Sequence, residues 1–278
     1  MKRILTLTLA ILMVFTMVAG FSACKKEEEK TDFEEIKEKG YFVCGITVYE
    51  PMNYFDEDGN LVGFDTEFAQ AVAKELGLEA KFQVINWPNK YLELKGGSID
   101  VIWNGFTLGL ESDGVSRKEY VDFTHAYLEN RQCIVTKADK VATLNTKESF
   151  KGLNGAVEGG SSGEGVAIEL AGDENKIAKF SAQSSALMEV VSDKADFAVI
   201  DYQMAKAMVG QGDYADLSIN NAYEPESEVY AIGCRKGSDF TAEINKAIET
   251  LSENGTLAAL AEKYGLTNDL IANIGKAE

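Results

Sequence analysis

Residues 65–85 read DTEFAQAVAKELGLEAKFQVI and predict an amphipathic helix followed by a short strand. Asp65 can cap the helix, apolar side chains recur along one of its faces, and Gly77 ends it. The strand after the helix covers 81–85, and another strand is predicted upstream at 41–47. This part of the chain therefore predicts a strand–helix–strand unit.

The same alternation continues toward the C-terminus. Further strands are predicted at 99–103, 131–136, 155–158, 177–180, 197–200 and 229–234. Further helices are predicted at 161–170, 184–192, 244–251 and 257–264. Alternating strands and helices predict parallel α/β sheets with helices on their faces. Two such series in succession predict two lobes, and the short crossings between them favour a hinge.

The first residues have the three-part layout of a secretory signal. Met1-Lys2-Arg3 is basic, 4–19 is almost wholly apolar, and Phe-Ser-Ala-Cys ends at Cys24. This ending resembles the lipoprotein signal box, in which the Cys thiol receives a diacylglycerol, and an ordinary signal peptide with a chance Cys is the alternative. The next residues are rich in Lys and Glu and predict a solvated tether. We therefore expect a chain that is anchored to a membrane without spanning it.

Composition excludes several classes of function. The formal net charge is −18, and loss of the basic leader makes it more negative, so nucleic acid and anionic lipid headgroups are not expected partners. Beyond the leader, Cys44, Cys133 and Cys234 lie in apolar runs and predict buried strand residues, with a Cys133–Cys234 bridge left open. No metal-ligand spacing, phosphate-binding loop or Ser/His/Asp order occurs, so we expect no metal, no cofactor and no catalysis.

Several motifs carry a family resemblance. The runs 49–54 (YEPMNY) and 58–69 (DGNLVGFDTEFA) resemble the opening signature of family 3 extracellular solute-binding proteins for polar amino acids. The runs 98–107 (SIDVIWNGFT) and 121–127 (VDFTHAY) are similar to its second signature. The resemblance implies a two-lobed, periplasmic-binding-protein-like α/β fold that closes on an amino acid. It also implies a monomer that delivers this ligand to the membrane subunits of an ABC transporter.

The resemblance, together with the leader, implies how the chain divides. Residues 1–23 are the signal peptide, and 24–32 contain the lipidated Cys24 and the polar tether. The first lobe is discontinuous, with 33–135 as its first part and 220–278 as the returning tail. Residues 136–219 form the second lobe.

Two positions on the second lobe are expected to hold the ligand's charged groups. Asp201 ends a predicted strand, where ligands gather in α/β sheets, and by resemblance it accepts the ligand's ammonium. Capping of the helix 202–208 is the alternative role, and both can hold. By resemblance Ser162 contacts the ligand carboxylate at a helix start, whereas a capping box with Glu164 already explains Ser161.

The first lobe supplies the other candidates. The segment Asn104, Gly105, Phe106 and Thr107 leaves a buried strand abruptly, and Gly105 lets backbone approach a ligand closely. Thr107 matches the family's hydroxyl position, while a plain strand-exit turn is the alternative for Asn104. By resemblance, Tyr49 and Trp87 bracket the ligand side chain with aromatic faces.

The sequence departs from the family where an Arg normally binds the ligand carboxylate. Ser112 holds the usual spacing, and the segment 108–116 is several residues longer than expected. Counted back from 122–123, the motif places Arg117 in this role, and Arg131 is the fallback.

Two other functions remain as alternatives. One is a same-fold enzyme, such as a dehydratase acting on an amino-acid-like substrate. Against it, the chain's single histidine, His125, is expected to be a solvated or packed side chain rather than a catalytic one. The other is ligand sensing for a separate receptor. A sensory ectodomain in its own right would need a spanning helix and a cytoplasmic part, neither of which is expected here.

Overall fold

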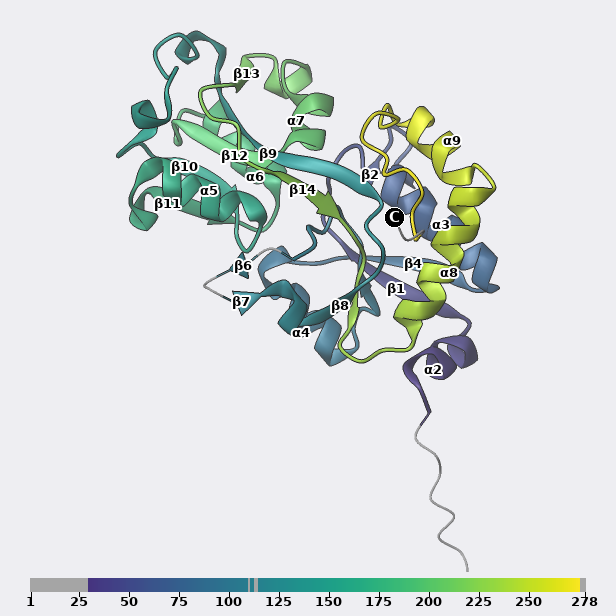
Figure 1. Ribbon diagram of the computed structural model, residues 1–278. Coiled ribbons are helices and arrows are strands. Elements are labelled where there is room, and N and C mark those ends of the chain that lie inside the picture. The colour runs from purple at the N-terminus through teal and green to yellow at the C-terminus, as the bar shows by residue number, and fades with distance from the viewer. Residues whose placement is uncertain (1–29, 110, 113–114, 276–278) are drawn as a thin grey trace, which may run out of the picture. The chain divides into compact units, whose positions relative to one another are not determined.

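A computed structural model describes residues 30–109, 111–112 and 115–275 (Figure 1). The chain forms two units, and all elements below belong to the second, Asp32–Glu278. The predicted signal and Cys24 lie outside the described residues. Within the described part, no helix combines the length and apolar character that a membrane crossing requires.

The first sheet has the strand order β4-β1-β5-β15-β8. Strand β1 (Tyr41–Ile46) runs parallel to β4 (Glu79–Val84) and to β5 (Val101–Ile102), which confirms the predicted strand–helix–strand unit. Strands β15 (Gly233–Arg235) and β8 (Val121–Phe123) add antiparallel pairs, so the sheet is mixed rather than wholly parallel.

Helices cover both faces of this sheet. Helices α3 (Phe64–Leu76), α8 (Phe240–Glu253) and α9 (Thr256–Lys263) pack together on one side, and α4 (Lys90–Gly96) packs on β1 and β5. Helix α2 (Asp32–Lys39) also contacts β1. Figure 1 shows α3, α8 and α9 beside one another.

Side-chain alternation along β1 explains this layering, because neighbouring residues of a strand point to opposite faces. Phe42 and Cys44 belong to the core that also contains Phe68 of α3. Val43, between them, packs in a separate cluster with Leu94 of α4. Full burial of side chains such as Phe42 and Phe68 contributes about 1.5–3 kcal/mol each.

Asp65 does not cap helix α3, contrary to the prediction. The helix begins at Phe64, and its N-cap position is Gly63. The Asp65 carboxylate is buried and accepts hydrogen bonds from the Gly105 N–H at 2.8 Å and from the Tyr127 hydroxyl at 2.8 and 3.0 Å. These interior donors compete with the helix end for the carboxylate, which therefore ties α3 to the segment after β5.

The second sheet has the order β11-β10-β12-β9-β13, with β14 pairing on β9 (Figure 1). Strand β10 is parallel to β11 and β12, whereas β9 pairs antiparallel with β12, β13 and β14. The strand bounds are β9 Leu128–Lys137, β10 Gly155–Glu158, β11 Ile177–Phe180, β12 Phe197–Asp201, β13 Leu217–Asn220 and β14 Ser227–Tyr230.

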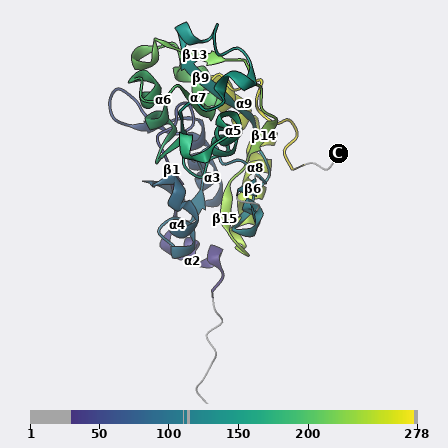
Figure 2. The same ribbon diagram turned by 90° about the vertical axis from the view of Figure 1, so that its left-hand side faces the viewer.

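Three helices pack on this sheet: α5 (Ser162–Ala171), α6 (Gln183–Val191) and α7 (Tyr202–Met208) (Figure 2). Val157 of β10 packs with residues of α5, while its neighbour Ala156 belongs to the cluster that contains residues of α6. The two helices therefore lie on opposite faces of the sheet.

The chain passes between the sheets more than once. Strand β9 pairs with β12 over Gln132–Val135 and continues to Leu128, beside Tyr230 of β14. The chain then enters the first sheet as β15. The single strand predicted at 229–234 is therefore wrong in one respect, because β14 and β15 belong to different sheets.

Two short hairpins complete the fold. Strands β2 (Tyr54–Phe55) and β3 (Leu61–Val62) pair before α3, and β6 (Glu111–Ser112) pairs with β7 (Val115–Ser116) before β8. The second hairpin lies in the segment that the sequence indicates to be unusually long.

The remaining cysteines agree with the predicted burial. Cys44, Cys133 and Cys234 are buried on β1, β9 and β15, and all three are free thiols. The structure therefore has no bridge between Cys133 and Cys234, which belong to different sheets.

Candidate functional site

A small cavity of about 10 Å³ lies where strands of both sheets end. It is lined by Trp87, Asn104, Gly105, Thr107, Arg117, Glu158, Ser161, Ser162, Gln183 and Asp201. All predicted site residues line this cavity except Tyr49 and Phe106. The segment after β5 and the last residues of β10 and β12 meet here, at the carboxyl ends of parallel strands where ligands of α/β proteins gather.

Arg117 is a buried cation in this cavity. It follows the β6–β7 hairpin directly, in a short 3₁₀ turn. One terminal nitrogen donates to the Thr107 carbonyl at 3.0 Å and the other to the Gly160 carbonyl at 3.1 Å, and the guanidinium carbon lies 4.6 Å from the Phe106 ring centroid. Burial lowers the pKa of Arg117. Among the side chains that the structure describes, no carboxylate lies within 4.0 Å of this guanidinium.

Arg131, the fallback candidate, already has partners. Its Nε lies 3.5 Å from a Glu224 carboxylate oxygen, and its guanidinium carbon is 4.0 Å from the Tyr202 ring centroid. It does not line the cavity. The geometry therefore places Arg117, and not Arg131, at the candidate site.

Asp201 is a buried carboxylate held by neutral amides. Asn130 and Gln132 donate to its Oδ1 at 2.7 and 2.6 Å, and the Gln183 amide also donates to it. The same Asn130 and Gln132 nitrogens donate to Glu228 Oε1 at 2.6 and 2.9 Å. Burial, followed by the negative charge of Glu228, raises the pKa of Asp201 to about 7. The residue occupies the N-cap position of α7 but makes no capping side-chain bond.

Ser162 and Thr107 face each other across the cavity, with their hydroxyl oxygens 2.9 Å apart. Ser162 opens helix α5, as predicted, and Thr107 lies beyond β5. The expected capping box does not form, because Ser161 makes no side-chain cap bond. Glu164 instead accepts a hydrogen bond from the Gly160 N–H at 2.6 Å.

Asn104 and Gly105 shape the wall of the cavity. The Asn104 amide is fully engaged, accepting from the Thr47 N–H and hydroxyl at 3.0 and 2.7 Å and donating to the Thr47 carbonyl and to Asn53 Oδ1. Gly105 has φ +57°, and a Cβ there would lie 2.8 Å from the Tyr49 ring. Asn104 thus fixes the strand exit, and Gly105 must be glycine for the ring of Tyr49 to pack beside it.

The aromatic candidates separate into one lining residue and two supporting ones. Trp87 lines the cavity and packs edge-on against Phe106, with ring centroids 5.7 Å apart. Phe106 lies under Arg117. Tyr49 packs beside Gly105, and its hydroxyl is 2.7 Å from the Tyr230 hydroxyl.

Three cavity residues are missing from the sequence-based prediction: Glu158, Ser161 and Gln183. Glu158 is the last residue of β10 and is 2% exposed. The signal that points to Asp201, a polar residue closing a predicted strand, applies equally to Glu158. Gln183 carries no such signal, because it opens a helix in a polar stretch and lies next to Asp201 only in the folded chain.

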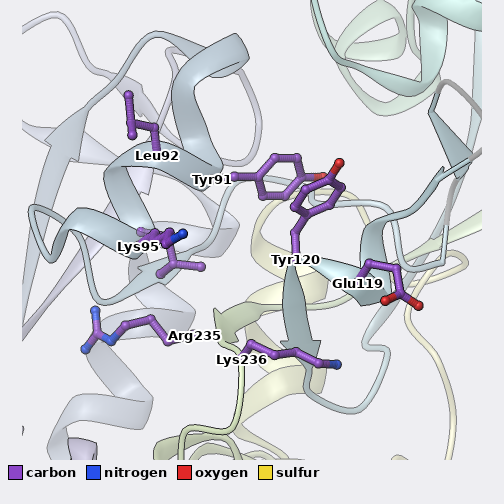
Figure 3. Close-up of a pocket in the computed structure, with 8 residues that line it drawn as sticks. Tyr91, Leu92, Lys95, Glu119, Tyr120, Arg235 and Lys236 are labelled. Atoms are coloured by element: carbon purple, nitrogen blue, oxygen red, sulfur yellow. The ribbon is translucent and has the colours of Figure 1, made fainter.

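A larger groove of about 600 Å³ lies elsewhere (Figure 3). It is lined by Tyr91, Leu92, Leu94, Lys95, Glu119, Tyr120, Arg235 and Lys236. Figure 3 shows the Tyr91 and Tyr120 rings against each other, and their centroids are 4.6 Å apart. Arg235 and Lys236 already pair with carboxylates, and Leu92 and Tyr120 are exposed. Because its paired cations and exposed apolar side chains offer no buried charge to a ligand, the smaller cavity is the better candidate.

Within the described part of the chain, no group of three or more His, Cys, Asp and Glu side chains could hold a metal ion. His125 lies outside the cavity lining, with Nε2 3.0 Å from a Glu249 carboxylate oxygen.

Comparison with known proteins agrees with this geometry. The model of the bacterial extracellular solute-binding proteins, family 3, matches residues 42–267. The arginine-binding extracellular protein ArtP of Bacillus subtilis (strain 168) is 29% identical, over 95% of this chain and 98% of its own. An ancestral arginine-binding protein, solved bound to arginine, is 33% identical with a TM-score of 0.73, over 81% of this chain and 98% of that one.

A fourth comparison concerns an ABC uptake transporter substrate-binding protein from Streptococcus pneumoniae, solved with bound histidine. It is 27% identical with a TM-score of 0.75, over 87% of this chain and 98% of that chain. These relatives are binding proteins, which favours ligand capture over the enzymatic alternative. The family match spans both sheets and every residue that lines the cavity, and the chain belongs to the bacterial extracellular solute-binding proteins, family 3.

Proposed function

We propose that this protein captures a free α-amino acid between Arg117 and Asp201 and delivers it to an ABC-type uptake transporter. The observation that carries the proposal is the pair of opposite charges, both buried, that face one cavity with only neutral partners. A buried charge without a counter-ion is costly, and a zwitterionic ligand supplies one for each.

The two ends of the ligand have separate sites. Arg117 can form a bidentate pair with the α-carboxylate, because its planar fork matches carboxylate geometry. The hydroxyls of Thr107 and Ser162 and the free N–H groups at the start of α5 add further donors. Asp201 accepts the α-ammonium, while its amide partners hold the carboxylate in place.

The bound ligands of the relatives support this chemistry, since arginine and histidine share the α-amino and α-carboxyl groups that the charge pair would hold. The cavity has room for about one water molecule, so the two sides of the site must part before an amino acid can bind.

The proposal includes a membrane anchor and movement of the two lobes. Cys24 would carry the lipid, and the polar residues after it would tether the folded part near the transporter. The part formed by 33–135 and 220–278 would close on 136–219 around the ligand. The protein would act as a monomer and would need no cofactor.

The charge pair provides the first test. Asp201→Asn and Arg117→Met each leave one charge of a bound amino acid without a partner. Each should therefore weaken binding by about 2–5 kcal/mol, roughly thirty-fold to several-thousand-fold. Isothermal titration calorimetry should follow a thermal-shift screen of the common amino acids. Arg131→Ala is the matched control and should bind nearly as the wild type does. Wild-type affinity in both Asp201→Asn and Arg117→Met would refute amino-acid capture at this site.

A further inference from the structure

Glu158 is a buried carboxylate that lines the cavity. In the proposed binding mode, neither the α-amino nor the α-carboxyl group of the ligand contacts it. It closes strand β10 and is 2% exposed. Among the described residues, the one hydrogen bond to its carboxylate comes from the Thr47 hydroxyl to Oε1, and at 3.4 Å it is weak. Among the side chains that the structure describes, no cation lies within 4.0 Å of it. Burial, with the charge of Asp201 next, raises the pKa of Glu158 to about 8.

The charges around the cavity do not balance for a ligand with a neutral side chain. Asp201, Glu158 and the half-buried Glu228 are acidic, whereas Arg117 and Lys90 are the buried cations near them. A zwitterion adds no net charge. One negative charge therefore remains uncompensated unless Glu158 stays protonated, as its raised pKa favours, or the ligand brings a second positive group.

Lys90 does not fill this role through a direct contact. Its ammonium donates to the carbonyls of Trp87 at 3.3 Å and Gly160 at 3.0 Å, and it lies 4.9 Å from the Trp87 ring centroid. Burial, with the positive charge of the nearby Arg117 next, lowers the pKa of Lys90 to about 7. Lys90 is thus committed to carbonyl oxygens and leaves the Glu158 carboxylate open toward the cavity.

Aromatic surface accompanies the open carboxylate. Trp87 lines the same cavity, and its neighbour Pro88 lies against the backbone that follows Glu158, since a Cβ at Gly159 would be 3.3 Å from Pro88 Cγ. A carboxylate and an indole that line the same cavity suit a cationic side chain, because both attract a positive group.

We propose that Glu158 is the residue that selects the ligand's side chain, and that the site takes an amino acid with a cationic side chain in preference to a neutral one of the same shape. This inference rests on the proposed function, since Arg117 and Asp201 must hold the α-groups for the side chain to point toward Glu158. Glu158 then acts as a specificity-determining acceptor, separate from the pair that recognises every amino acid.

Arginine and citrulline test the proposal, because a neutral urea replaces the guanidinium at nearly constant size. By titration calorimetry at pH 8, the wild type should prefer arginine, and Glu158→Gln should lose about 10- to 150-fold in arginine affinity, the value of a hydrogen bond to a charged group. Citrulline affinity should change little, so the preference should collapse. Lysine and norleucine form a second pair with the same expectation.

Three outcomes would overturn the assignment: a wild type that binds arginine and citrulline equally, a Glu158→Gln variant that weakens both equally, or a wild type that binds only neutral amino acids. Asp201→Asn separates these failures from failure of the proposed function, since it should weaken arginine and citrulline together. If Glu158→Gln does not fold, proton release by the wild type decides. Measured at pH 7.5 in buffers of different ionisation enthalpy, arginine should release more protons than citrulline as Glu158 ionises, and equal release would refute the proposal.

Discussion

Asp201 and Glu158 end neighbouring parallel strands, and each turns a carboxyl group into the protein interior without a cation beside it. In the free protein both groups have raised pKa values, about 7 and about 8, because burial favours the neutral acid. A ligand cation reverses this preference. Capture of a ligand and loss of a proton are therefore linked at these two residues.

Ligand affinity should consequently depend on pH. Because the pKa of Asp201 is raised to about 7, the carboxylate that accepts the ammonium is present above this pH and is protonated below it. Affinity should therefore fall as the pH drops from 8 to 5, approaching tenfold per pH unit well below 7. Titration calorimetry across this range would measure the effect, and the weak binding of Asp201→Asn should show a smaller slope. A constant wild-type affinity would contradict the assignment.

At the scale of single residues, the sequence predicts the site residues that lie at the end of a strand. It does not predict those that another element of the fold brings to the site. Asp201 is found because it ends a predicted strand, and the same argument applies to Glu158. Gln183 cannot be found in this way, because its contact with Asp201 depends on how α6 packs beside β12. Local pattern carries information about position along an element, but not about neighbours across a sheet.

At the scale of elements, the β6–β7 hairpin explains the unusual spacing before Arg117. The extra residues pair with each other, and the 3₁₀ turn begins immediately after them. The guanidinium thereby reaches the cavity despite the longer segment. Apolar periodicity predicts most strands and helices here, but it treats 229–234 as one strand because both β14 and β15 are apolar. Which sheet a strand joins is set by long-range pairing, which a local pattern does not contain.

The attachment of α3 to the cavity wall can be tested at Asp65. Asp65→Ala leaves the Gly105 N–H and the Tyr127 hydroxyl without their buried acceptor, and each lost partner costs about 1–3 kcal/mol. The free energy of unfolding should fall by a few kcal/mol, and ligand binding should weaken as the segment 104–107 loses its support. Urea denaturation and calorimetry would measure the two effects. Glu75→Ala, an exposed change on the same helix, should alter neither.

For the whole molecule, position relative to the membrane matters as much as the cavity. The folded unit begins at Asp32, and Arg235 binds this residue through Nε at 3.1 Å, which fixes where the chain leaves the fold. A lipid on Cys24 would hold the cavity within a short reach of the membrane. A released protein would instead diffuse away from its transporter.

The anchor predicts a simple difference in labelling. Cells given a labelled fatty acid should incorporate it into the wild-type protein and carry that protein into the membrane fraction, because in the proposed anchor the Cys24 thiol is the acceptor. Cys24→Ser removes the thiol and should abolish the label. Cys44→Ser is the matched control, since this buried thiol belongs to the folded core. Equal labelling of wild type and Cys24→Ser would exclude a lipid at this position.

The contacts across the cavity also have a kinetic consequence. Arg117 and Lys90 both donate to the Gly160 carbonyl, and the Thr107 hydroxyl contacts that of Ser162. Residues near the first sheet are therefore hydrogen-bonded to residues near the second. If the two lobes close around the ligand as proposed, a solute from the medium enters only after these bonds part. The rate of capture is then set by how often the protein opens, because a solute that collides with the closed form does not bind. The same bonds re-form behind a bound solute, so slow entry and long residence have a common origin.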